Sequence, residues 1–287
     1  MSAIAIPRAG AAGLAPRWFA LRAFGTEAGK GLRLMWRRRF MVVVAAAAFG
    51  LTYLGISLFI GGGHLVKDLM VRTVPALLAV AVANTAAVEG TGGIAEEING
   101  GTLEQTRLSP ASPQLQALGR MTALAVEGLA AAVVLGIVFV FGAGLGIVFV
   151  FGAGLGIHPH PAVVLPALLT IADALGYGLI MTALVVRVPG IGAITHVANM
   201  VIMAFGGMLV PVSVFPHGME IFARFIPTAL GVQSANTILA GHGLAAAWSD
   251  GTLPWLLAHT AVVVTAGLGL YVLNIRHAQR EGGLSPR

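Results

Sequence analysis

The stretch MVVVAAAAFGLTYLGISLFI, residues 41–60, carries no charged side chain and is long enough to cross a bilayer as one helix. A transmembrane helix needs about 20 mainly apolar residues, because its backbone polar groups must be satisfied within the helix itself. The whole chain has this character, since 57% of its 287 residues are hydrophobic and only 10% are charged. Soluble domains carry about 25% charged residues. The sequence therefore predicts an all-α integral membrane protein.

Six apolar runs are predicted to span the membrane, which places both ends of the chain on one side. Lys and Arg identify that side, because they are enriched in cytoplasmic loops. Eight of them precede the first run and six more lie in the even-numbered loops and the C-terminal tail, against three on the other side. We therefore expect a multi-pass protein of the cell membrane with cytoplasmic N- and C-termini. The predicted spans are Met41–Ile60, Val74–Gly93, Met121–Leu145 or beyond, Ala162–Val186, Gly190–Val214 and Thr252–Asn274.

The sequence divides into an N-terminal tail (residues 1–40), a transmembrane domain (41–275) and a C-terminal tail (276–287). In the N-terminal tail, apolar and basic residues recur on opposite faces at spacings of three and four, which predicts an amphipathic helix on the inner leaflet. No apolar core with a following cleavage site is visible there, so we expect no cleavable signal peptide. The apolar face comprises Trp18, Leu21, Gly25, Ala28, Leu32 and Met35, and the polar face comprises Arg22, Thr26, Lys30, Arg33 and Arg37.

The third apolar run contains a duplication, because GIVFVFGAGL occurs at residues 136–145 and again at 146–155. As a helix, the run from Met121 to Ile157 would be about 55 Å long, whereas the hydrocarbon core is about 30 Å thick. Ten residues are not a whole number of helical turns, so the copies cannot present the same face. We interpret the repeat as a local duplication whose extra turns tilt, kink at the glycines or enter the outer loop.

One polar stretch, EEINGGTLEQTRLSPASPQLQALGR at residues 96–120, separates the second and third spans on the predicted cytoplasmic side. Gly100 and Gly101 permit a tight bend, and Ser109 and Ser112 each precede a proline that can occupy the first position of a helix. The stretch therefore predicts a helical hairpin on the inner face of the membrane. The residues assigned to its first, short helix are Glu96, Glu97, Gln105 and Arg107.

Two stretches resemble the permeases of ABC-2 type transporters, the membrane subunits of multidrug- and daunorubicin-resistance-like exporters. Glu97–Pro113 is similar to the segment after the second span in that family, and Phe205–Leu239 is similar to its fifth span with a proline-rich exit and short outer-leaflet helices before the last span. The prolines of the second match are Pro211, Pro216 and Pro227. The residues of the first match are Glu97, Gly101, Thr102, Leu103, Glu104, Ser109 and Pro110.

The resemblance implies the permease subunit of an ATP-driven exporter in which two permease chains, identical or related, form the pathway. Separate ABC ATPase subunits, which hold ATP and Mg, would grip the cytoplasmic hairpin as a coupling helix; no cofactor is expected on this chain. The implied substrate is a drug or a lipid-like amphiphile, which suggests efflux and antibiotic resistance. The coupling residues expected from the resemblance are Glu97, Gly101, Thr102, Leu103, Glu104, Arg107, Ser109 and Pro110.

The ATPase is expected on another chain, because a phosphate-binding loop requires the motif G-x-x-x-x-G-K-[ST]. The sequence contains two lysines, and the one that follows a glycine, Lys30, is followed by Gly31 rather than by Ser or Thr. We therefore do not expect this chain to be an enzyme. The chain has no cysteine, which excludes disulfides and thiolate metal sites.

Polar residues inside the predicted spans are costly in lipid and often functional. Asp173 lies near the middle of the fourth span, where it could pair with a neighbouring helix, line a pathway or contact a cationic substrate. Asn199, in the fifth span, is more typical of an interhelical hydrogen bond than of a substrate contact. Glu89 and Glu127 are expected near the cytoplasmic interface. His158 and His160 in HPHP lack a third ligand, so a metal site is not predicted.

Three alternatives remain open from the sequence alone. Polysaccharide export is the main alternative within the ATP-driven class. An ion-coupled secondary transporter would need several midplane ionisable groups and often repeated halves, but Asp173 is the one firm midplane acid and the halves do not match. An intramembrane enzyme would need a catalytic constellation that the sequence does not display. The basic residues form no soluble patch, so no nucleic-acid partner is expected.

Overall fold

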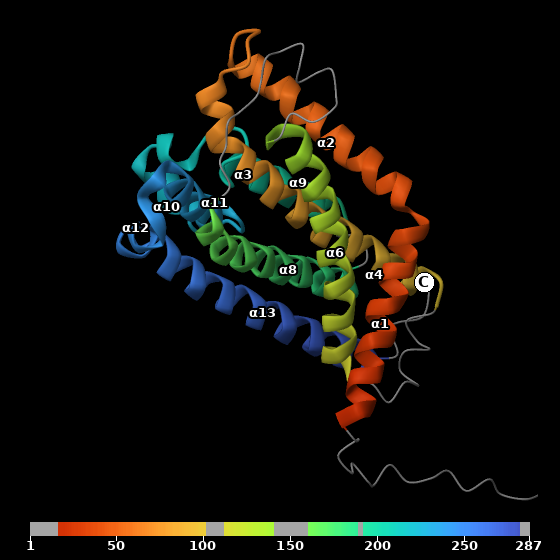
Figure 1. Ribbon diagram of the computed structural model, residues 1–287. Coiled ribbons are helices and arrows are strands. Elements are labelled where there is room, and N and C mark those ends of the chain that lie inside the picture. Colours follow the sequence, from red (N-terminus) through yellow and green to blue (C-terminus); the bar gives the residue numbers. More distant parts are fainter. Residues whose placement is uncertain (1–16, 102–111, 141–159, 189–191, 282–287) are drawn as a thin grey trace, which may run out of the picture.

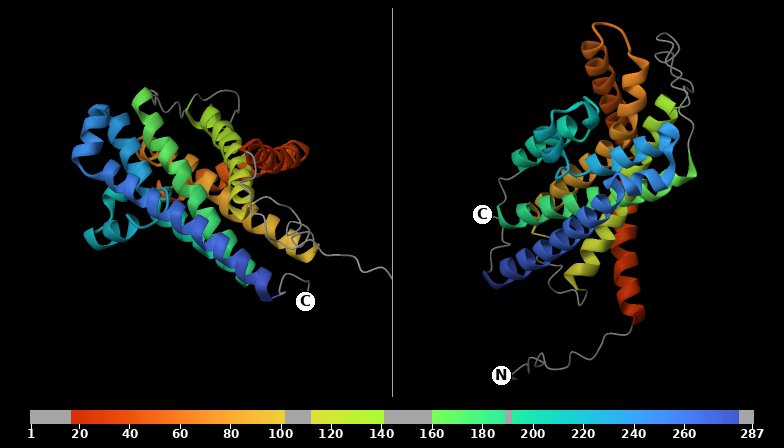
Figure 2. Two further views of the ribbon diagram at one scale, coloured as in Figure 1. Left: turned by 90° about the horizontal axis from the view of Figure 1, so that it is seen from below. Right: turned by 90° about the vertical axis from the view of Figure 1, so that its left-hand side faces the viewer.

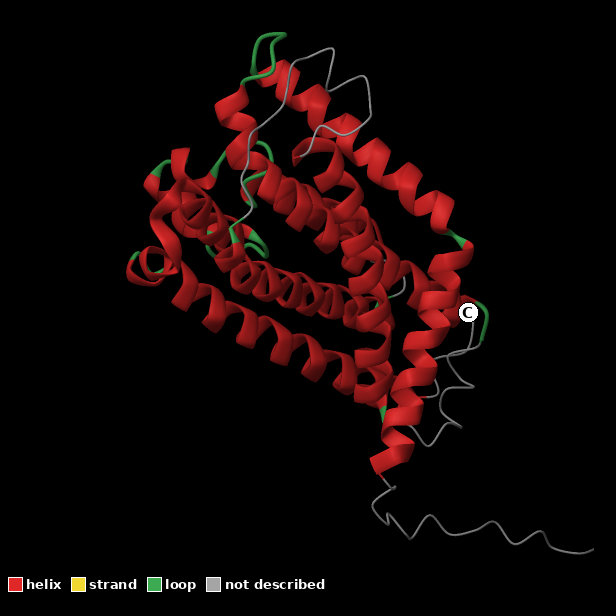
Figure 3. Cartoon of the chain, in the orientation of Figure 1, coloured by secondary structure: helices red, strands yellow, loops and turns green. Residues whose placement is uncertain are grey.

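A computed structural model describes residues 17–101, 112–140, 160–188 and 192–281 of the chain. Every regular element within these ranges is a helix (Figures 1 and 3), which confirms the predicted all-α class. The main helices are α1 (Arg17–Arg37), α2 (Arg39–Ile60), α3 (Lys67–Asn84), α4 (Gly90–Asn99), α6 (Pro113–Val140), α8 (Val164–Arg187), α9 (Gly192–Phe205), α10 (His217–Ala223), α11 (Ala229–Thr237), α12 (Gly243–Ser249) and α13 (Thr252–Glu281). The shorter helical segments are η1 (Thr85–Glu89), η2 (Pro161–Val163), η4 (Val212–Val214) and η5 (Ile238–His242).

Five helices in the described ranges are long and apolar enough to cross a membrane, as predicted for five of the six spans. In their most apolar windows, from 22% to 56% of the residues are buried inside the molecule, so a large share of each helix remains available to contact lipid. The chain is therefore a membrane protein. The five stretches are Arg39–Ile60, Lys67–Asn99, Pro113–Phe139, Pro161–Arg187 and Thr252–Ala278.

The sixth span, predicted at Gly190–Val214, is not confirmed. Helix α9 has 14 residues, about 21 Å at 1.5 Å per residue, and is too short to cross a hydrocarbon core of about 30 Å. It ends because Gly206 is followed by Gly207, whose φ of +90° lies in the left-handed region. Pro211 comes next and cannot continue a helix.

The polar hairpin differs from its prediction in one respect. Glu96 and Glu97 do not form a separate short helix, because α3, η1 and α4 run as one helix of 33 residues from Lys67 to Asn99. The predicted bend is present, since Gly100 follows the last helical turn and Gly101 has a φ of +65°. The second helix, predicted to start near Ser109 or Ser112, is present as the beginning of α6, which starts at Pro113 and continues into the span predicted from Met121. The amide N–H of Leu115 lies 3.4 Å from Ser112 Oγ, which caps this helix.

The long helices form a tilted bundle (Figures 1 and 2). We call the end at which α4 ends, α6 begins and α8 ends the hairpin end; α13 also ends there, and α10, α11 and α12 lie at the opposite end. Helices α8 and α13 run side by side in the same direction. Their backbones approach at Gly176, where an added Cβ would lie 2.9 Å from Val264 N, and at Gly267, where it would lie 2.6 Å from Gly176 O. Small residues permit such close packing between membrane helices.

Helix α3 lies at the centre of the bundle, and its Leu77 and Val80 are almost completely buried. Tyr53 on α2 packs edge-on against Phe139 of α6, with ring centroids 5.3 Å apart. Its hydroxyl lies 2.6 Å from Thr73 Oγ1 on α3. These contacts join α2, α3 and α6, and the hydrogen bond between α2 and α3 stabilises them where lipid cannot satisfy a polar group.

The predicted N-terminal helix is present as α1, and the chain bends between α1 and α2 at Arg38 (Figure 1). Ala28 of its apolar stripe is buried against α6, and Gly31 beside the stripe meets Ala123 of α6 at close range. Leu21 of the same stripe does not pack in this way, since it is 72% exposed. Helix α1 is thus bound to the bundle along one side and leaves apolar surface free for lipid on another.

Candidate functional site

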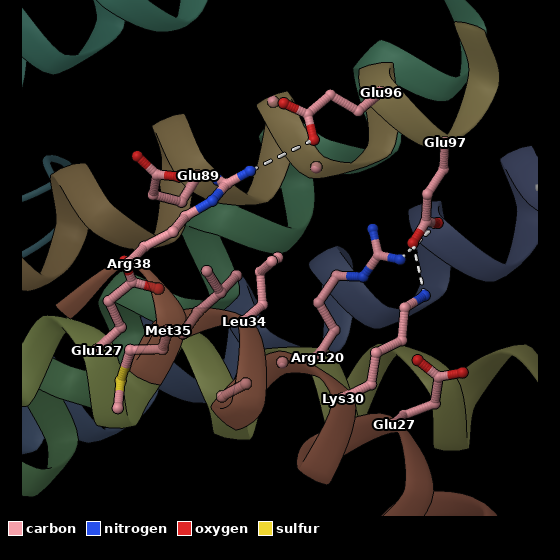
Figure 4. A pocket seen from close by; sticks show the side chains of 15 residues that line it. Glu27, Lys30, Leu34, Met35, Arg38, Glu89, Glu96, Glu97, Arg120 and Glu127 are labelled. Carbon is pink, nitrogen blue, oxygen red and sulfur yellow. Dashed lines mark hydrogen bonds and ion pairs between the residues drawn. The ribbon is translucent and has the colours of Figure 1, made fainter. Parts of the chain in front are cut away.

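A cluster of charges lies at the hairpin end, where α1, α4 and α6 meet (Figure 4). Glu97 occupies its centre. Its Oε2 lies 2.7 Å from Arg120 Nη2, and its Oε1 lies 3.1 Å from Lys30 Nζ. We call Lys30, Glu97 and Arg120 the charged joint, because each of the three residues comes from a different helix.

The pair at the centre of the charged joint is largely withdrawn from water. The side chains of Glu97 and Arg120 are 17% and 19% exposed, whereas that of Lys30 is 61% exposed. Arg120 Nη1 is buried and has no hydrogen-bond partner in the part of the chain that the structure describes. The guanidinium charge of Arg120 therefore depends on Glu97, and removal of Glu97 would leave it buried without its ion-pair partner. Removal of Arg120 would leave Glu97 paired with Lys30.

A cavity of about 150 Å³ adjoins the joint. Arg38, at the bend between α1 and α2, extends across it, and its Nη2 lies 3.9 Å from Glu96 Oε2 (Figure 4). Both side chains of this second pair are well exposed, so the pair contributes little to stability. The other acidic residues that line the cavity are Glu27, Glu89 and Glu127.

Glycines let α1 approach α6 closely enough for the joint to form. A Cβ at Gly119 would lie 2.7 Å from Glu27 Cβ and 3.1 Å from Phe24 O. A Cβ at Gly31 would collide with Ala123. A side chain larger than hydrogen at either position would separate the helices and lengthen the ion pair of Lys30.

The structure places two of the eight predicted coupling residues. Glu97 lies in the charged joint, and Gly101 forms the left-handed turn that ends the first arm of the hairpin. The coupling role of all eight stays a prediction. Thr102, Leu103, Glu104, Arg107, Ser109 and Pro110 lie outside the described residues.

A second polar cluster surrounds Asp173, which is 1% exposed in the middle of α8. Its Oδ1 lies 2.8 Å from His259 Nδ1 on α13, and its Oδ2 accepts a hydrogen bond of 3.1 Å from the backbone N–H of Thr228. Thr228 has a φ of +79°, which is strained for a β-branched residue. His259 Nε2 in turn lies 3.3 Å from Phe225 O. Asp173 thus ties the turn before α11 to two long helices.

Asn199, the other polar residue singled out in the spans, joins three helices. Its Nδ2 donates a hydrogen bond of 3.0 Å to Asn84 Oδ1 at the end of α3, and Tyr177 of α8 donates to its Oδ1 at 3.5 Å. The structure thus places Asn199 in interhelical hydrogen bonds. A role of Asp173 or Asn199 in a transport pathway remains a prediction.

The sequence alone does not identify the partners of these residues. It indicates Lys30 and Arg120 as charges that set the topology, and it does not indicate His259 as the partner of Asp173. The sequence does contain one signal for the partner of Asp173. An isolated acid in a long apolar helix needs a counter-group, and basic or imidazole side chains in other helices are the candidates. In the described part of the chain, no three His, Asp or Glu residues lie close enough together to hold a metal ion.

The chain was compared with known proteins. A family model described as ABC-2 type transporter matches residues 23–239, which include the charged joint, Asp173 and Asn199. No curated protein matches the chain.

Proposed function

The chain belongs to the ABC-2 type transporter family as a membrane permease, and from this premise we propose that it forms the export pathway for a drug or a lipid-like amphiphile. Permeases of this family work with an ABC ATPase subunit. In this proposal ATP and Mg bind to that separate subunit, and a second permease chain, identical or related, completes the pathway.

The observation that carries the proposal is the charged joint. The hairpin formed by α4 and α6 is the part of the bundle that an ATPase would grip. The ion pairs of Glu97 connect both arms of this hairpin to α1, and α1 continues through the bend at Arg38 into α2. A force on the hairpin therefore reaches at least three long helices through short contacts between charged groups.

We place the hairpin end in the cytoplasm. The bend between α1 and α2, the start of α6, the end of α8 and the end of α13 all carry arginines, whereas the opposite end carries Lys67, Arg72 and Arg224. This distribution follows the positive-inside rule. In this orientation α10, α11 and α12 lie on the outer side of a cell membrane.

Ion-coupled secondary transport has less support. Its strongest candidate group was Asp173, and both carboxylate oxygens of Asp173 are engaged by His259 and Thr228. Polysaccharide export remains the alternative within the family.

The proposal is tested by reconstituting the purified chain in proteoliposomes with an ABC ATPase subunit that co-purifies with it. We expect uptake of a fluorescent amphiphile into inside-out vesicles only when the ATPase and ATP are both present. Steady transport by this chain without a nucleotide-hydrolysing partner would contradict the proposal.

The coupling hairpin gives a more specific prediction. Glu104→Lys should uncouple ATP hydrolysis from transport, because reversing the charge replaces an attraction for donors of the ATPase with repulsion. Membrane insertion should be unchanged. The matched control is Glu220→Lys, the same charge reversal on α10 at the opposite end, which should leave coupling intact. Normal transport per ATP hydrolysed in the Glu104 variant would rule out the coupling role.

A further inference from the structure

Two adjoining cavities lie in the half of the bundle away from the hairpin end, between α3, α6, α8 and α11. Their volumes are about 490 and 220 Å³. They share six lining residues, which makes them parts of one hollow. The shared residues are Pro75, Leu78, Ala132, Val163, Ala167 and Ala235.

The hollow is almost entirely apolar and opens through the side of the bundle. Val133 and Ile137 on α6 are 56% and 45% exposed, and Val164 on α8 is 58% exposed, although all three line it. These residues lie in two of the predicted membrane-spanning stretches. With both stretches in a membrane, the opening among the described residues faces hydrocarbon rather than water.

Packing energetics require that such a space be filled. Protein interiors are close-packed, and the walls of an empty apolar cavity lose dispersion contacts. Water would not fill it, because water in a cavity needs several polar partners. In a bilayer the molecules beside the opening are lipid acyl chains.

His160 lines the outer end of the hollow, and Arg72 lies on α3 one helical turn before the lining residue Pro75. On α3 the lining residues Pro75, Leu78 and Val82 recur with the helical period, and Arg72 lies one turn before Pro75 on the same face. Arg72 is exposed. His160 lines the cavity, and its Nδ1 accepts a hydrogen bond of 3.2 Å from the N–H of Ala162. A neutral imidazole that accepts at Nδ1 carries its proton on Nε2 and can donate it to a phosphate oxygen.

We propose that this hollow is a lateral binding site for a phospholipid, with one acyl chain between α3, α6 and α8 and the phosphate near Arg72 and His160. The arrangement combines an apolar slot of suitable size for a ligand with basic donors at headgroup depth. The site is independent of ATP-driven export, and its test uses no ATPase.

The test is photo-crosslinking of the full-length chain in nanodiscs that contain a phospholipid with a diazirine on its acyl chain. We expect labelled peptides to concentrate at residues 129–137 and 163–171. Ala167→Phe and Ala132→Phe fill the hollow and should lower this labelling about tenfold, which corresponds to about 1.4 kcal/mol of binding free energy. The control is Ala261→Phe, which adds the same side chain on an exposed face of α13 that does not line the hollow. It should leave the labelling unchanged.

Competition separates the acyl chain from the phosphate. A lysophospholipid should compete at a concentration about fivefold lower than a monoacylglycerol of equal chain length, because one arginine near a headgroup contributes about 1 kcal/mol. Arg72→Gln should remove most of this preference. Equal competition by the two lipids would overturn the role of the phosphate. Labelling that is spread evenly over all exposed helices would overturn the site itself. So would labelling that is unchanged in both Ala132→Phe and Ala167→Phe, provided that the control Ala261→Phe remains monodisperse.

Discussion

Replacing Asp173 with alanine is expected to destabilise the protein by about 3–5 kcal/mol, the range found when one partner of a buried charged pair is removed. The variant would leave the N–H of Thr228 and the ring of His259 without their acceptor inside the bundle. It would also release the left-handed turn at Thr228, which these bonds hold in place. Thermal unfolding of the purified chain in detergent would show the loss, and proteolysis near residues 225–228 should become faster.

Asp173→Asn distinguishes a structural role from contact with a cationic substrate. The amide keeps one oxygen for the N–H of Thr228 and can donate to His259, so we expect most of the stability to return. If Asp173 instead binds a cationic substrate through its charge, the asparagine variant would be stable but unable to transport it. Asp68→Ala removes an exposed acid from the first turn of α3 and should cost less than about 1 kcal/mol. Wild-type stability in the alanine variant would contradict the role of Asp173 as a tie between helices.

The second large effect is expected at the charged joint. Glu97→Met should destabilise the protein by about 3–5 kcal/mol, because it leaves the charge of Arg120 buried without its ion-pair partner. Arg120→Met should destabilise the protein less, because Glu97 keeps its ion pair with Lys30. The double variant should be more stable than the sum of the two losses predicts, with a coupling energy of about 1–3 kcal/mol. The measurement is a double-mutant cycle based on equilibrium unfolding, with transport per ATP hydrolysed as a second readout.

The same cavity supplies the control pair. Arg38 Nη2 and Glu96 Oε2 are 3.9 Å apart, and the two side chains are 48% and 71% exposed. The double-mutant cycle with Arg38→Met and Glu96→Met should therefore give a coupling energy of about 0.2–1 kcal/mol. Equal coupling energies for the two pairs would mean that the burial of Glu97 and Arg120 has no energetic consequence. If transport per ATP hydrolysed is normal in both single variants of the charged joint, the joint stabilises the fold but does not transmit force.

Composition was sufficient to predict the membrane class and five of the spans, because lipid exposure demands long apolar helices whatever their partners. The boundaries were harder to predict. The second span continues to Asn99 and the third begins at Pro113, since a helix that leaves the membrane no longer needs apolar residues. The length of span five was overestimated because the run Gly190–Val214 contains no Asp, Glu, Lys or Arg, although Gly206 and Gly207 end the helix within it.

The site residues could be predicted only one at a time. Glu97 was identified from its motif, but its partner Arg120 lies 23 residues away and Lys30 lies 67 residues away. Asp173 and His259 are separated by 86 residues. Helical periodicity indicates which face a residue occupies and not which helix that face meets, so these pairings depend on the tertiary arrangement alone.

The unbroken helix from Lys67 to Asn99 has a mechanical consequence. Its 33 residues extend for about 50 Å, so about 20 Å project beyond a hydrocarbon core of about 30 Å. The wide turn of η1, the kind of local widening often found at functional positions, divides this rod into a long arm, α3 with 18 residues, and a short arm, α4 with 10 residues. A rod that pivots at this turn moves the tip of its long arm further than the tip of its short arm, and in the opposite direction. A small sideways stroke at Asn99 would therefore arrive, enlarged and reversed, at the far tip.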